Sequence, residues 1–149
     1  MNALLVATDQ KDAPRVRAMI EGAANPDAVV DKAMPPLTPM RGGGDWAEWD
    51  RWSALLIACY YGDLTIAKLL LEAGASTELR VTKSGRTALM FIAGTSAQLP
   101  ARGAELLLDC GAEVNAVDDF GATPLMFAAD TGNTAMVETL LARGANVHM

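Results

Sequence analysis

Apolar and polar positions over residues 119–147 follow the period of two short amphipathic helices. The first run of apolar positions follows Thr123 and Pro124, an N-cap residue and a residue suited to the first helical position, and it stops at Gly132. The second run stops at Gly144, because glycine favours a left-handed C-terminal cap. Neither helix can bury its apolar face alone, so the pair requires similar neighbours.

Three further copies of this pattern precede it, which predicts a repeat protein. The third copy, GRTALMFIAG with AELLLDCGAEVNAVD, places Thr87 thirty-six residues before Thr123, with its extra residues around 96–100. The second copy, SALLIACYYGDLTIAKLLLEAGAS, begins at Ser53. The first copy, ALLVATDQKDAPRVRAMIEGAAN, is degenerate and carries Lys11 where the others have glycine or serine.

The stretch GATPLMFAADTGNTAMVETLLARGANV closely resembles an ankyrin repeat, and the resemblance covers nearly the whole chain except residues 28–47. It implies an all-α fold, a solenoid of stacked antiparallel helix pairs joined by hairpin-like loops. We therefore expect a single domain over residues 1–149. Its expected units are an N-terminal capping repeat at 1–27, an extended finger insertion at 28–47, and repeats at 48–81, 82–117 and 118–149.

The insertion lengthens the connection between the first and second repeats. Leu4 matches Leu55 at a distance of 51 residues, about eighteen more than the usual 33-residue period. Its sequence, AVVDKAMPPLTPMRGGGD, has closely spaced prolines followed by three glycines, which cannot continue a helix. Two interpretations remain open for residues 35–44: disorder, or a specific docking role.

Aromatic residues concentrate in the second repeat. Trp46, Trp49 and Trp52 fall within seven residues, and Tyr60 and Tyr61 follow in the same repeat. Aromatic side chains with a polar group are enriched at interface hot spots, which favours a binding role. Alternatively, the tryptophans cover the leucines of the degenerate first repeat.

Composition and charge limit the kinds of molecule that the chain is expected to bind. The 149-residue chain has a net charge of -6 and a pI of about 4.6, which argues against nucleic-acid binding. The absence of a long apolar run or a basic signal-peptide start predicts a cytoplasmic protein without membrane contacts.

The two cysteines are expected to differ in exposure. Cys59 is expected to be a small buried side chain and Cys110 to be partly exposed, with no disulfide between them.

Catalytic chemistry is not indicated by any residue pattern. His148 has no serine, cysteine or carboxylate constellation near it, and Gly42–Gly44 precedes no phosphate-loop lysine. Asp118 and Asp119 are explained by a turn in which aspartate bonds its own backbone. We therefore expect a non-enzymatic protein without cofactor or metal.

The resemblance implies that another protein is bound by a concave face of inner helices and fingers. Leu56, Met90 and Met126 are expected to form an apolar stripe where the family usually places a histidine. The basic cluster of Arg80, Lys83 and Arg86 is either a solvated loop or a contact for an acidic partner segment. The expected protein-binding residues are Trp46, Trp49, Asp50, Trp52, Tyr60, Tyr61, Lys83, Arg86, Met90, Asp119, Phe120, Met126 and Asp130.

Two further roles stay open. The chain could be a structural subunit or adaptor of a larger assembly, tethered by the finger or by an uncapped C-terminal repeat that is apolar near Phe127 and Met136. In that case we expect a monomer or weak self-association through the C-terminal repeat. The resemblance also implies that Asn115 matches the asparagine that ankyrin-type repeats present to asparaginyl hydroxylases.

Overall fold

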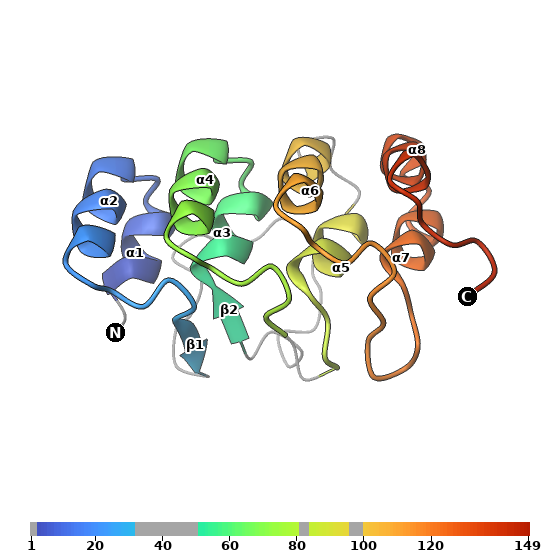
Figure 1. Cartoon of the computed structure of the whole chain (residues 1–149), viewed down its shortest axis with the longest axis horizontal. Helices are drawn as coiled ribbons and strands as arrows, with labels where there is room; N and C mark the ends of the chain where they lie inside the picture. The colour runs from blue at the N-terminus through green and yellow to red at the C-terminus, as the bar shows by residue number, and fades with distance from the viewer. Residues whose placement is uncertain (1–2, 32–50, 81–83, 96–99) are drawn as a thin grey trace.

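Residues 3–31, 51–80, 84–95 and 100–149 are described by a computed structural model, and within these ranges the chain forms four pairs of antiparallel helices. Figure 1 shows the first helices of the pairs in one row and the second helices in another, stacked from the N-terminus to the C-terminus. The inner row contains α1 (Ala3–Asp9), α3 (Ala54–Tyr60), α5 (Ala88–Ala93) and α7 (Pro124–Asp130); the outer row contains α2 (Ala13–Glu21), α4 (Leu64–Glu72), α6 (Pro100–Asp109) and α8 (Thr134–Ala142). The expected helical solenoid is confirmed.

Local capping residues decide where the helices start. The hydroxyl groups of Ser53, Thr87 and Thr123 accept hydrogen bonds from the backbone N–H three residues later, at 3.1, 3.5 and 3.3 Å. Outer helices use a carboxylate or amide oxygen in the same way, supplied by Asp12, Asp63 and Asn133. Because each cap depends only on neighbouring residues, these helices start where the sequence predicts.

The core lies between the two rows and is built from small and branched side chains. An added Cβ on Gly103 of α6 would lie 3.2 Å from the carbonyl oxygen of Cys59 in α3, so a larger residue there would separate the helices. Cys59 is fully buried and Cys110 is exposed, and both are free thiols. Burial, with a smaller contribution from Cys110, raises the pKa of the Cys59 thiol to about 12. The expectation for these two cysteines is confirmed.

A short β ladder pairs the start of the predicted insertion with the segment that leads into α3. Strand β1 (Val29–Asp31) pairs antiparallel with β2 (Arg51–Ser53), with Val30 opposite Trp52. Figure 1 shows β1, β2 and the loops leading into α5 and α7 projecting from the same side of the array, beyond the inner row. Trp46, Trp49 and Asp50 and the segment 35–44 lie outside the described residues. No helix in the described ranges is long and apolar enough to cross a membrane.

Candidate protein-binding surface

The loop between the third and fourth repeats, residues 117–123, is held by a buried carboxylate and is called the fourth finger below. Asp118 Oδ1 accepts hydrogen bonds from the backbone N–H groups of Phe120 and Ala122, both at 2.9 Å. The Asp118 N–H donates to the Ala122 carbonyl at 3.1 Å. The expected turn, with an aspartate bonding its own backbone, is confirmed. Three bonds therefore fix the loop that carries Phe120.

Arg86 lies beside the second oxygen of the same carboxylate, Asp118 Oδ2. Its Nε lies 3.5 Å from Asp118 Oδ2, and its guanidinium lies 4.5 Å from the ring centroid of Phe127. The Asp118 side chain is only 1% exposed, so the ion pair is shielded from solvent and is coupled to a cation–π contact. These contacts are made within the chain, but the Arg86 side chain is still 28% exposed, so its role in binding a partner stays a prediction.

Arg80 joins the loops of the third and fourth repeats. Its Nη1 donates to the Gly85 carbonyl at 2.7 Å and lies 3.4 Å from Asp119 Oδ1. The backbone N–H of Asp119 donates to the Ser84 carbonyl at 3.0 Å. Arg80 and Arg86 thus both face acids of the next finger, whereas Lys83 lies outside the described residues.

Three apolar side chains of the fourth finger and α7 are exposed. Phe120 is 82% exposed at the tip of the fourth finger, Val117 is 38% exposed in the same loop, and Met126 of α7 is 41% exposed. Asp119 and Asp130 are exposed as well. We call Val117, Phe120 and Met126 the fourth-repeat patch. Val117 was missed from the sequence, because a valine before an aspartate pair gives no periodic signal.

The expected stripe of Leu56, Met90 and Met126 is wrong for its first two members. Met90 is fully buried and Leu56 is 1% exposed, so neither is available to a partner. Both belong to inner helices with another inner helix on each side, whereas α7 contacts α5 on one side only within the described chain. Met126 is therefore the exposed member of this series.

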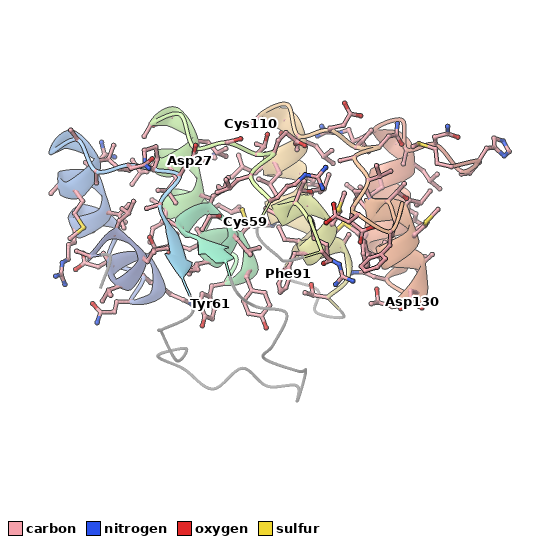
Figure 2. All side chains as sticks on the ribbon, turned by 90° about the horizontal axis from the view of Figure 1, so that it is seen from below. Asp27, Cys59, Tyr61, Phe91, Cys110 and Asp130 are labelled. Atoms are coloured by element: carbon pink, nitrogen blue, oxygen red, sulfur yellow. The ribbon has the colours of Figure 1, made fainter. Side chains whose placement is uncertain are left out.

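A row of aromatic rings crosses the ends of the inner helices. The rings of Tyr60 and Tyr61 have centroids 5.4 Å apart and meet edge to face, and Tyr60 lies 5.9 Å from Phe91. Lys11 Nζ lies 5.4 Å from the Tyr61 ring centroid. Figure 2 shows Tyr61, Phe91 and Asp130 along one edge of the array. Tyr60 is the last residue of α3 and Tyr61 is its C-cap. Phe91 was not among the predicted binding residues.

Chemistry other than binding finds no support in the described residues. They contain no group of three or more His, Cys, Asp or Glu side chains arranged to hold a metal ion. The raised pKa of Cys59 keeps that thiol protonated at neutral pH, and the thiolate is the nucleophilic form. The side chain of Trp52 is not among those described, although its backbone lies in β2.

Comparison with known proteins agrees with the repeats found in the sequence and in the structure. The family model described as "Ankyrin repeats (3 copies)" matches residues 4–118 and residues 55–149. The chain is 42% identical over 104 residues to "Ankyrin repeat and KH domain-containing protein mask" of Drosophila melanogaster, a match covering 68% of this chain and 2% of the relative. It is 43% identical over 89 residues to "Protein fem-1 homolog A-like" of Mus musculus, covering 60% and 13% of the two chains. The chain therefore spans only a small part of these relatives.

Proposed function

The chain belongs to the ankyrin-repeat family, whose repeats generally mediate protein–protein interactions and are generally non-enzymatic, and we propose that it binds a protein partner through the fourth-repeat patch and the aromatic row. The observation that carries this proposal is the 82% exposure of Phe120 on a loop fixed by Asp118. A large apolar side chain kept in water contributes almost no burial to folding, and its exposure on an ordered loop favours a role in binding.

The hydrogen bonds of Asp118 hold the backbone of the fourth finger in place in the unbound protein. Binding through a mobile loop costs about 0.5–1.5 kcal/mol for each side chain that is immobilised, in addition to backbone ordering. The bonds from Asp118 and its contact with Arg86 fix the backbone beneath Phe120 before any partner arrives. The scaffold then binds as a rigid body, with little rearrangement.

Charge indicates what kind of partner fits. Asp119 and Asp130 are exposed on the repeat that carries the patch, and the whole chain has a net charge of -6. We propose a partner segment that presents an apolar side chain beside lysine or arginine, in a cytoplasmic protein rather than a nucleic acid or a membrane. Tyr60 and Tyr61 extend the contact toward the first repeat.

The test is affinity capture from a lysate of the source cells, followed by mass spectrometry. The parent chain is compared with a Phe120→Ser, Met126→Ser variant, and with Met149→Ser as the matched control for losing an exposed apolar side chain elsewhere. All three side chains are exposed, so the fold should persist, as circular dichroism would show. We expect a partner captured by the parent and the control, and lost by the double variant. Equal capture by all three chains would refute the patch.

A subunit or adaptor role is the second candidate. It is favoured by a separate exposed apolar surface at the C-terminal end of the array, formed by Leu141 and Val147. The expectation of an apolar end near Phe127 and Met136 is corrected in its residues, because Met136 is fully buried and Phe127 is half-buried. Under this alternative, removing Leu141 would reduce capture and removing Phe120 would not.

A further inference from the structure

The aromatic row consists of Tyr60, Tyr61 and Phe91, which come from two neighbouring repeats inside the array. Tyr60 is the last residue of α3, Tyr61 is its C-cap, and Phe91 lies in α5. All three residues are half-buried, so each keeps some surface in contact with solvent. The face of an aromatic ring carries partial negative charge. The row therefore presents ring surface that suits a positively charged group.

One cation of the chain already lies over this row. Lys11 Nζ is 5.4 Å from the ring centroid of Tyr61, within the separation of about 6 Å at which a ring face attracts a cation. Lys11 belongs to the first repeat and Tyr61 to the second. The contact shows that the Tyr61 face accepts a positive charge from a group outside its own repeat.

The backbone of Lys11 is unusual at this turn. Its φ is 57°, in the left-handed region where a residue with a Cβ is strained. Gly62 and Gly132 occupy the matching position in the second and fourth repeats, each with φ of 68°. A lysine at this position costs folding free energy that a glycine would not. Strained residues of this kind cluster at functional sites.

The charges of the turns favour a cationic ligand. The four turns, from the last residue of each inner helix to the residue before the next outer helix, are residues 9–12, 60–63, 93–99 and 130–133. In their sequences Lys11 is the one basic residue, and the acidic residues are Asp9, Asp12, Asp63 and Asp130. Figure 2 shows Asp130 on the same edge as Tyr61 and Phe91. This edge therefore attracts a positive charge and repels an acidic segment.

We propose that the aromatic row binds an arginine side chain of the protein partner, and that Lys11 competes with this side chain for the Tyr61 ring. The inference rests on the proposed function, because it names the group that the partner presents to the row. Arginine fits the row better than lysine, since its guanidinium is planar, stacks on aromatic faces and is more weakly hydrated than an ammonium group. The carboxylates of the turns add to the attraction.

The test uses N-acetyl-arginine amide as the probe and N-acetyl-citrulline amide, its uncharged isostere, as the matched control. Each compound is titrated to roughly 100 mM into the isotope-labelled full chain at constant ionic strength, because a single side chain binds weakly. NMR spectra of the backbone amides and aromatic rings report where the probe binds. We expect shifts confined to the row that grow with the concentration of the arginine probe and are absent with citrulline. Equal shifts with both compounds, or no shifts at the row, would overturn the proposal.

A pair of lysine variants tests the competition. Lys11→Gln removes the cation over Tyr61, whereas Lys68→Gln removes the same charge from an exposed position of the outer helix α4. The arginine probe should bind Lys11→Gln about two- to fivefold more tightly than the parent chain, and Lys68→Gln with nearly the parent's affinity. An equal gain in both variants would reduce the effect of Lys11 to net charge and overturn the competition, as would no gain in Lys11→Gln.

A pair of tyrosine variants tests the ring itself. Tyr61→Phe keeps an aromatic face and should retain the shifts, whereas Tyr61→Leu should lose them, with circular dichroism as the check on folding. Retained shifts in a folded Tyr61→Leu chain would overturn the proposal. Where that variant does not fold, the citrulline control and the lysine pair still decide. None of these measurements involves Phe120 or a captured partner, so their failure is distinguishable from failure of the proposed function.

Discussion

The end of α2 carries its glycine one residue too early, and moving that glycine should stabilise the protein. Helices α4, α6 and α8 are followed by Gly74, Gly111 and Gly144 in the left-handed conformation, with φ of 89°, 89° and 87°. In the first repeat this position is Ala23, with φ of 64°. The preceding Gly22 has φ of -79° and ψ of 16°, which any residue can adopt. We therefore consider the exchange Gly22→Ala with Ala23→Gly.

The size of the expected gain in the free energy of unfolding follows from the backbone strain at Ala23. A left-handed residue with a Cβ costs about 1–2 kcal/mol relative to glycine. The exchange leaves composition unchanged, so the conformational entropy of the unfolded chain stays nearly the same. Ala23 is exposed, and its methyl group contributes little burial. A Cβ on Gly22 would lie 3.3 Å from the carbonyl oxygen of Ala18, but Ala73 occupies the same position in the second repeat with φ of -80°. We expect a net gain of about 1–2 kcal/mol.

Urea unfolding followed by circular dichroism would measure the gain, and hydrogen exchange of the α2 amides would show whether it lies in the first repeat. For a chain of this size a gain of 1 kcal/mol raises Tm by about 2–4 °C. The single Ala23→Gly variant should gain less, because it adds freedom to the unfolded chain. Unchanged or lower stability of the exchange variant would refute the reasoning. A loss in Gly22→Ala alone would identify the Ala18 contact as the cause.

Four further predictions concern the loops of the third and fourth repeats and the cysteines. Asp118→Ala should lower the free energy of unfolding in urea by about 2–4 kcal/mol, because it leaves two backbone N–H groups without their acceptor and removes the carboxylate that pairs with the Arg86 guanidinium. Asp118→Asn should recover part of the loss. Gly85→Ala should lower the free energy of unfolding by about 1–3 kcal/mol. The φ of Gly85 is 73°, and an added Cβ would meet neighbouring arginine and aspartate side chains at 2.4 and 2.5 Å. Wild-type stability of this variant in urea would contradict the prediction. Iodoacetamide should modify only Cys110 in the native chain, as intact mass would show, and a second native adduct would contradict the burial of Cys59. Because the pKa of Cys59 is about 12 when folded against 9.0 ordinarily, its contribution to stability should be complete below pH 9 and fall as pH rises toward 12.

Local features were predicted well from the sequence. The caps at Ser53, Thr87 and Thr123, the stop at Gly144 and the turn at Asp118 each depend on a few neighbouring residues, so pattern and residue type suffice. The boundaries between units, at 27, 47, 81 and 117, stay a prediction.

Features that depend on a neighbouring repeat could not be predicted in the same way. Met90 is buried because α5 has inner helices on both sides. Arg86 forms an ion pair with Asp118 of the next repeat. Leu141 has the same place in its helix as Leu108 but a different environment, because no repeat covers it in the described chain. Helical periodicity assigns such pairs the same role, and only the stacking order separates them.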